Sequence, residues 1–358
     1  MSGPSDDEAG WRTRPTSAEI DLGAFSRNID AIVARLPEGS RLIAVLKANA
    51  YGHGAVELAR RCNPERVAMI GVALLEEALE LRRAGITLPI LVFGSTTNVD
   101  HDVTLGATGP EQLAAICEAA RHRDIGIHLK LDSGMGRMGV VESELADVIG
   151  MIRSAPRLRI DGIYTHFANA DESNDTFTAT QIANYDRMVE ALRAAGVTAP
   201  LHHFANSAAT LRGLVRPGDY ARVGIALYTL TPVMRWRTEI VRLKTLPPGH
   251  AVGYGTTFHT RRESRIATLP VGYADGYRRV LSNNAEVLVR GKRAPVVGRV
   301  SMDLVTIDVT DIEAAAGDEV VLLGDSIGVE ELAAKANTIS YEIFCGVSAR
   351  VPRRYLQS

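Results

Sequence analysis

Residues 41–62, RLIAVLKANAYGHGAVELARRC, contain the first complete strand–turn–helix unit of the sequence. Residues 41–47 form a short apolar run that ends on Lys47, which is typical of a buried strand. Residues 54–62 have apolar positions at helical spacing, and the turn between the two segments is rich in small residues and glycine. This stretch therefore favours an α/β fold in which a lysine lies at the end of a buried strand.

The same unit recurs along the chain as far as about residue 232. Further strands are predicted at 67–73, 90–94, 103–107, 125–132, 160–168, 201–205 and 220–227, with helical patterns at 74–85, 108–120, 142–154, 181–196 and 206–213 between them. About eight such units in about 190 residues are typical of a (β/α)₈ TIM-like barrel, which we place at residues 17–232.

The pattern changes after about residue 233, where helical periodicity nearly disappears. Short strands are predicted at 239–246, 265–272, 285–291, 293–299, 304–309 and 318–324, separated by turn residues, with one helical segment at 329–338. Residues 233–358 are therefore predicted to form a second, mostly β domain.

Length and composition limit the possible functions. A chain of 358 residues is too long for a single ordinary hydrophobic core, so two domains are expected. Its net charge of −2 gives no electrostatic reason to bind nucleic acid or a membrane. Residues 1–16 are polar and are expected to be a flexible N-terminal tail, and no apolar run approaches the ~20 residues of a membrane span. Cys62, Cys117 and Cys345 are scattered and indicate neither zinc nor disulfides, so no metal is expected and a cytoplasmic location is predicted.

Unusual polar residues follow the strands of the predicted barrel. Because chemistry in such barrels takes place at the carboxyl ends of the strands, these residues are predicted to meet at one rim. They are Lys47, Arg137 in DSGMGRMG, His166, Asn206, Ser207 and Arg222, and the chain continues after Arg222 with Gly224 and Ile225, whose backbone amides are also at this rim. Each has an ordinary structural explanation when it is taken alone, such as a helix cap for Asn206 or an ion pair for Arg222.

Together these residues suit pyridoxal 5′-phosphate (PLP). A lysine amine forms a Schiff base with the cofactor aldehyde. Ser207 with Gly224 and Ile225 offers a hydroxyl and backbone amides to a phosphate. An arginine at the pyridine nitrogen favours the unprotonated ring, which suits the return of a proton to Cα more than transamination.

The chain resembles the alanine racemase family of fold type III PLP enzymes from about residue 17 to 355. AVLKANAYGHG is similar to the family's cofactor-lysine signature. Other matching segments are KLDSGMGRMG, THFANADE, ANSAA, RVGIALY, VGYGTTF, PVGYADGYRR, VGRVSMD and RVPRRY.

The resemblance implies racemisation of L- and D-alanine by two bases, supplying D-alanine for cell-wall peptidoglycan. It implies that Lys47 and Tyr254 are the bases, on the D-side and the L-side of the substrate. It further implies cofactor contacts from Tyr51, His166, Asn206, Ser207, Arg222, Gly224 and Ile225, substrate contacts from Arg137, Tyr273, Met302 and Asp303, and a carbamylated lysine at Lys130. In this family the β domain completes the site of the other subunit, so a homodimer with shared active sites is expected.

Two positions depart from the family's pattern. Thr229 stands where glycine is frequent, and Ala349 stands where some members have a tyrosine that reaches the cofactor phosphate. Three alternatives remain: an amino-acid racemase of broader specificity, for example for serine; a fold type III decarboxylase, which Arg222 disfavours; and a PLP carrier without enzymatic activity, which the β domain disfavours.

Overall fold

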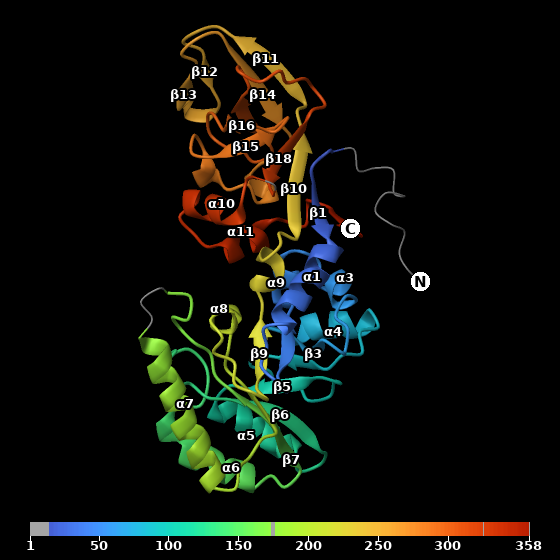
Figure 1. Cartoon of the computed structure of the whole chain (residues 1–358), viewed down its shortest axis with the longest axis vertical. Coiled ribbons are helices and arrows are strands. Elements are labelled where there is room, and N and C mark those ends of the chain that lie inside the picture. The colour runs from blue at the N-terminus through green and yellow to red at the C-terminus, as the bar shows by residue number, and fades with distance from the viewer. Residues whose placement is uncertain (1–13, 173–175, 325, 358) are drawn as a thin grey trace. The chain divides into compact units, whose positions relative to one another are not determined.

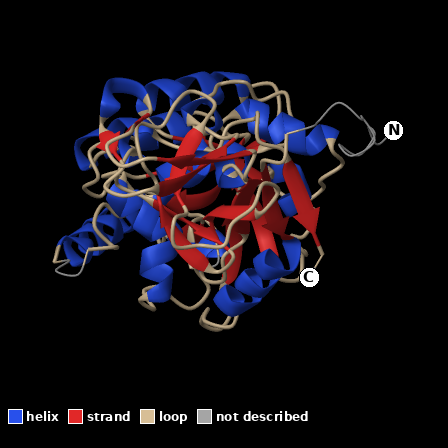
Figure 2. Cartoon of the chain, turned by 90° about the horizontal axis from the view of Figure 1, so that it is seen from above, coloured by secondary structure: helices blue, strands red, loops and turns tan. Residues whose placement is uncertain are grey.

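The computed structural model describes residues 14–172, 176–324 and 326–357. Contacts divide the chain into two compact units, whose elements are labelled in Figure 1 and coloured by type in Figure 2. The barrel unit comprises Phe25–Ala50 and Ala55–Thr231. The β unit comprises the described residues up to Ala24, then Tyr51–Gly54, and the chain from Pro232 onward.

The barrel unit contains an eight-stranded, all-parallel sheet in the order β8-β7-β6-β5-β4-β3-β2-β9. Its strands are β2 (Arg41–Val45), β3 (Val67–Val72), β4 (Ile90–Val92), β5 (Thr104–Ala107), β6 (Ile125–Lys130), β7 (Leu158–Tyr164), β8 (Leu201–His203) and β9 (Tyr220–Val223). The amide of Arg222 donates to the carbonyl of Ala205 at 2.9 Å, just after β8, and nearly closes the sheet into a barrel. The predicted fold class is confirmed.

Helices separate most of these strands in the sequence. They are α1 (Leu22–Val33), α2 (Lys47–Tyr51), α3 (Ala55–Ala59), α4 (Leu75–Arg83), α5 (Pro110–Ala119), η1 (Glu142–Glu144), α6 (Leu145–Arg153), α7 (Phe177–Ala194), α8 (Ser207–Leu211) and α9 (Ala226–Thr229). Gly85 follows α4 with φ +80°, as expected of a glycine that ends a helix. Ile43, Met69 and Leu91, on three adjacent strands, form one buried cluster of the core.

The β unit contains three sheets. The largest has the order β16-β15-β18-β10-β1-β19, and the others are β11-β14-β17 and β12-β13. The strands are β1 (Ser17–Asp21), β10 (Met234–Glu239), β11 (Arg242–Leu246), β12 (Ala251–Val252), β13 (Phe258–His259), β14 (Ser264–Leu269), β15 (Glu286–Val289), β16 (Lys292–Pro295), β17 (Val305–Asp308), β18 (Glu319–Leu323) and β19 (Arg353–Leu356). The helical segments are η2 (Tyr254–Thr256), η3 (Tyr273–Asp275), η4 (Arg279–Leu281), α10 (Val329–Lys335) and α11 (Ser340–Gly346).

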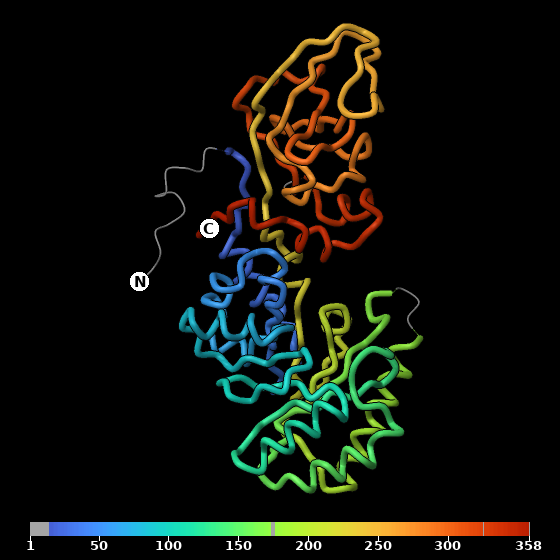
Figure 3. The backbone as a smooth tube through the Cα atoms, turned by 180° about the vertical axis from the view of Figure 1, so that it is seen from behind, coloured from blue at the N-terminus to red at the C-terminus, as the bar shows by residue number. Residues whose placement is uncertain are grey.

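The N-terminal segment differs from the sequence-based expectation. Residues 1–13 of the predicted tail lie outside the described residues, but Arg14 donates to both carboxylate oxygens of Asp275 at 2.8 and 2.9 Å. Thr16 is buried against Thr238, and β1 then pairs with β10 and β19, beside which Figure 3 traces it. Residues 14–24 therefore pack with the β unit rather than with the barrel.

Residues 51–54 also belong to the β unit. The ring of His53 lies 4.8 Å from that of Phe344 in α11, and Arg353 donates to the carbonyl of Gly52 at 2.9 Å. Within the described part of the chain, no helix has both the length and the apolar character required to cross a membrane.

Candidate active site

The candidate site lies at the carboxyl ends of the barrel strands. Lys47 follows β2, Lys130 ends β6, His166 follows β7, and Arg222 lies near the end of β9. Asn206 and Ser207 follow β8, and Gly224 and Ile225 follow β9. Because all eight strands are parallel, these ends open on the same face of the barrel.

The segment labelled α2 is not a regular α-helix, because the backbone after Lys47 turns in the left-handed sense. Ala48, Asn49, Ala50 and Tyr51 all have φ between 52° and 53°. This conformation costs roughly 1–2 kcal/mol for each residue other than glycine. Hydrogen bonds hold part of the turn: the amide of Ala50 donates to the carbonyl of Leu46 at 2.8 Å, and Asn49 Oδ1 accepts from the amide of Ala55 at 2.7 Å. Strained backbone of this kind is characteristic of functional sites.

Arg222 is the centre of a buried hydrogen-bond network. Its Nη2 donates to the carbonyl of Thr165 at 2.8 Å and to Nδ1 of His166 at 3.0 Å. Its Nη1 donates to the carbonyl of His203 at 2.6 Å and to Nδ1 of the same histidine at 3.1 Å. Since a guanidinium can only donate, both Nδ1 atoms accept, and His203 must donate from Nε2 to Nδ1 of His128, 2.7 Å away.

Four cationic side chains, Arg222 among them, act on His166. Burial, followed by the positive charges of Arg222, Arg137, Lys130 and Lys47, lowers the pKa of His166 to about 3, so the imidazole is neutral. Burial, followed by the positive charges of Arg137, Arg222 and Lys47, lowers the pKa of Lys130 to about 8, although Asp132 acts in the opposite direction. Burial lowers the pKa of Arg222 only to about 10, so its guanidinium stays charged at neutral pH. The mouth of the barrel is therefore suited to an anion.

Ser207 and the chain after β9 form a cluster of polar groups. Ser207 Oγ accepts from the amide of Gly224 at 3.0 Å and from that of Ala226 at 3.4 Å. Asn206 Oδ1 accepts from the amide of Ala209 at 3.0 Å and caps α8. A hydroxyl and backbone amides that converge in this way are groups that hold a phosphate.

The loop that carries Arg137 is organised by Asp132. One carboxylate oxygen accepts from the amides of Gly134, Met135 and Gly136 at 2.7–3.1 Å, and the other accepts from the amide of Arg137 at 3.0 Å. Burial opposes ionisation of Asp132, but these four bonds together lower its pKa. The carboxylate therefore fixes the backbone on which Arg137 stands.

The remaining predicted site residues belong to the β unit. Tyr254 lies in η2 and is 72% exposed, and Tyr273 and Met302 are also exposed. Backbone bonds from Tyr273 to Ser301 and from Ala274 to Met302, each 3.0 Å, join their two loops.

Asp303 and Tyr51 are also found in the β unit. Asp303 accepts from Arg350 at 2.7 Å. Tyr51 is buried, with its ring 5.7 Å from that of Tyr341, and burial raises its pKa, so its hydroxyl stays protonated. The predicted site residues thus divide between the two units.

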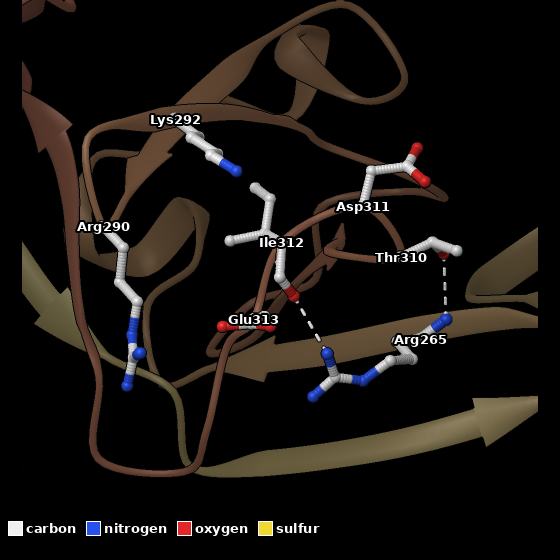
Figure 4. A pocket seen from close by; sticks show the side chains of 7 residues that line it. All are labelled: Arg265, Arg290, Lys292, Thr310, Asp311, Ile312 and Glu313. Carbon is white, nitrogen blue, oxygen red and sulfur yellow. Dashed lines mark hydrogen bonds between the residues drawn. The ribbon is translucent and has the colours of Figure 1, made fainter.

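A pocket of about 530 Å³ in the β unit has charged walls but no comparable chemistry (Figure 4). It is lined by Arg265, Arg290, Lys292, Thr310, Asp311, Ile312 and Glu313. Arg265 donates to the carbonyl of Ile312 at 2.9 Å, and Arg290 pairs with Asp318 at 2.7 Å. These two arginines already have partners, and the pocket is not the candidate site.

Sequence reasoning missed His128, His203, Asp132 and Glu77. The two histidines lie inside predicted strands, where a polar residue is a signal of an internal network. Asp132 binds amides two to five residues further along the chain, and an aspartate before a glycine-rich turn is the local signal that could have indicated this. The bond from Ala48 to Glu77 spans 29 positions, and sequence spacing does not reveal such a contact.

Comparison with known proteins gives a consistent result across the chain. The models "Alanine racemase, N-terminal domain" and "Alanine racemase, C-terminal domain" match residues 20–232 and 233–355. The alanine racemase of Halothermothrix orenii is 40% identical over 96% of this chain and 97% of that protein. The alanine racemase of Desulfovibrio desulfuricans is also 40% identical, over 96% of this chain and 99% of that protein.

Solved structures agree with these matches. The alanine racemase from Streptomyces lavendulae superposes with a TM-score of 0.92 and 37% identity, covering 97% of this chain and 98% of that one. The alanine racemase from Bacillus anthracis with bound L-Ala-P superposes with a TM-score of 0.90 and 36% identity, covering 96% of this chain and 95% of that one. The resemblance inferred from the sequence is confirmed.

Proposed function

The chain belongs to the alanine racemase family, whose members are isomerases, and we propose that it racemises alanine with PLP by a two-base mechanism. The D-alanine formed would supply cell-wall peptidoglycan. The observation that carries the proposal is the contact between Arg222 and a neutral His166 in a mouth that also holds Lys47, Lys130 and Arg137.

The residues of the barrel mouth fit PLP. Lys47 would bind the cofactor covalently, and Ser207 with the amides of Gly224 and Ile225 would hold its phosphate, with Tyr51 and Asn206 as further contacts. His166 would face the ring and Arg222 its pyridine nitrogen. When bound, PLP supplies an aldehyde for the substrate amine and withdraws electrons from Cα.

Arg222 favours racemisation over the alternative chemistries. Since its guanidinium stays charged, it would donate a hydrogen bond to the pyridine nitrogen without protonating it. The weaker withdrawal of electrons that results suits return of a proton to Cα. A carboxylate at this position would favour the decarboxylase alternative, and the residue here is arginine.

Racemisation requires a proton acceptor on each face of the substrate. We propose Lys47 for the D-side proton and Tyr254 for the L-side proton, with Arg137 binding the substrate carboxylate and with Tyr273, Met302 and Asp303 lining the entrance. Lys130 is proposed to be carbamylated and to orient Arg137. Its pKa of about 8 supports this, because carbon dioxide reacts only with the neutral amine.

We further propose that two subunits share their active sites. The exposure of Tyr254, Tyr273 and Met302 supports a surface that a second copy covers. In this scheme residues 17–232 bind the cofactor and residues 233–358 contribute the second base. We keep the cytoplasm as the proposed location, on the spacing of the three cysteines.

An assay for D-alanine formed from L-alanine, run with visible spectroscopy of the bound cofactor, tests the proposal. Racemisation with cofactor absorbance is expected, and absence of both from the PLP-loaded protein would contradict it. Parallel assays with L-serine and other L-amino acids separate an alanine enzyme from one of broader specificity.

Mixing two inactive variants, Lys47→Ala and Tyr254→Phe, tests the shared sites. Random exchange would restore roughly a quarter of wild-type activity, because half of the dimers are mixed and one of their two sites is intact. No recovery after proven subunit exchange would show that each site is built from one chain.

A further inference from the structure

The carboxylate of Glu77 joins the ends of two neighbouring barrel strands. Its Oε2 accepts from the amides of Ala73 and Leu74 at 2.8 and 3.0 Å, at the beginning of α4. Its Oε1 accepts from the amide of Ala48 at 2.6 Å, 29 positions earlier in the chain. One side chain therefore holds both the start of α4, after β3, and the residue that follows Lys47.

The two oxygens perform different tasks. A glutamate three residues into a helix ordinarily satisfies amides at the start of that helix, and Oε2 does this for α4. The bond to Ala48 is not part of helix capping. It reaches the first residue of the left-handed turn, where φ becomes positive directly after Lys47.

The position of this bond matters because the turn is strained. Ala48 and Ala50 carry a β-carbon and no special preference for positive φ, so local propensity alone would return them to the right-handed region. Asn49 ties the far side of the turn to Ala55, and Glu77 ties its beginning. The amide of Leu46, before Lys47, donates to the carbonyl of Gly71 in β3 at 2.9 Å. Without the bond to Glu77, the backbone would still be tied to β3 before Lys47, but Ala48, directly after Lys47, would lose its tie to the start of α4.

We propose that Glu77 is a positioning residue for Lys47: by holding the amide of Ala48, it keeps the strained turn in the conformation that presents the lysine amine to the cofactor. This inference rests on the proposed function, since it assumes that Lys47 is the residue that binds PLP. Glu77 itself touches neither cofactor nor substrate in this scheme.

The test compares Glu77→Gln with Glu76→Gln. The first variant keeps the shape of the side chain but has a single acceptor oxygen, so it cannot serve both tasks. The second makes the same charge change one residue earlier, on an exposed side chain of the same helix. The readout is the rate at which cofactor-free protein attaches PLP to Lys47, trapped by borohydride reduction and located by peptide mass, at a temperature where all forms are fully folded.

We expect Glu77→Gln to slow attachment about tenfold or more, the effect typical of losing a hydrogen bond to a charged group, with Glu76→Gln unchanged. A lower melting temperature with an unchanged rate of attachment would overturn the proposal and leave Glu77 as a helix cap. If Glu77→Gln does not accumulate as folded protein, Glu77→Asp, whose carboxylate is one methylene shorter, replaces it with the same expectation. A wild-type protein that attaches no PLP at Lys47 would instead contradict the proposed function.

Discussion

Arg222 donates from Nη2 to Nδ1 of His166 at 3.0 Å, and this contact fixes the state of the histidine. Because the guanidinium cannot accept, Nδ1 of His166 must carry the lone pair and its proton must lie on Nε2. Nη1 of Arg222 likewise donates to Nδ1 of His203, so the proton of His203 lies on Nε2. Nε2 of His203 then donates to Nδ1 of His128. These hydrogen bonds require the imidazoles of His166, His203 and His128 to be neutral.

These neutral histidines predict a loss of stability in acid. Burial is the main cause that lowers the pKa of His166 to about 3, of His128 to about 4, and of His203 well below its usual value. An unfolded histidine titrates near ~6.5. At pH values between the folded and the unfolded pKa of these histidines, the unfolded chain binds more protons than the folded chain. The free energy of unfolding is therefore fully retained above pH ~6.5 and falls as the pH is lowered.

Each histidine should contribute a slope of up to about 1.4 kcal/mol per pH unit. His128→Gln retains a hydrogen-bond acceptor for His203. It should reduce the slope by up to about 1.4 kcal/mol per pH unit, which corresponds to one bound proton, between roughly pH 4.5 and 5.5. Urea denaturation of the cofactor-free protein at several pH values measures this slope. An identical slope in wild type and variant would mean that His128 is already protonated in the folded protein.

Lys47→Ala should remove the visible absorbance of covalently bound cofactor and abolish racemisation while the protein remains folded. The expectation follows from the place of Lys47 at the end of β2, where its charge acts on both Lys130 and His166. Absorption spectra, melting temperature and D-alanine formation measure the three properties. Lys130→Ala is the matched control, since it removes the other lysine of the mouth and should keep the absorbance. Retention of that absorbance in Lys47→Ala would refute the assignment.

The sequence allowed prediction of the barrel because each strand and helix has its own local periodicity. The cluster of Ile43, Met69 and Leu91 is an example, since each lies in an apolar run that is visible without the structure. Likewise the polar residues at the strand ends stood out against apolar neighbours, and the structure brings Arg222 to His166 and Ser207 to Gly224.

Other features depend on contacts between distant segments and have no local signature. The left-handed turn contains alanine and asparagine rather than glycine, and Ala48 is held by Glu77. β1 pairs with strands more than 200 positions away, so its membership of the β unit was not foreseen. The tautomers of His203 and His128 follow only from their distances to a donor that cannot accept.

Tyr254→Phe should retain the cofactor, because Lys47 is untouched, but lose most racemisation. Removing a general base typically costs 10²- to 10⁴-fold. Exchange of the Cα proton with deuterated solvent should survive better from D-alanine than from L-alanine, since only the lysine face still works. Mass spectrometry of the recovered amino acid measures both rates. Tyr355→Phe, which changes an exposed tyrosine of the β unit without a proposed role in the site, is the control. Equal exchange from both isomers in Tyr254→Phe would contradict the role of Tyr254 as the L-side base.

Ala349 is the position at which substrate preference should be adjustable. It is exposed, and its neighbour Arg350 donates to Asp303 at 2.7 Å, which ties this segment to the proposed entrance loop. A tyrosine here would add volume beside the substrate and a hydroxyl for the cofactor phosphate. A hydrogen bond to a charged group is worth roughly 1.5–3 kcal/mol. Ala349→Tyr should therefore bind PLP more tightly and increase the preference for alanine over serine.

Ala349→Phe separates the two effects, because it adds the volume without the hydroxyl. It should raise the alanine-to-serine ratio of kcat/KM and leave PLP dissociation as in the wild type, whereas Ala349→Tyr should change both. The comparison requires PLP dissociation and kcat/KM for the two substrates in all three proteins. If neither quantity changes in either variant, Ala349 is a passive substitution and other groups, or a bridging water, which is nearly as effective as a direct bond, close the site.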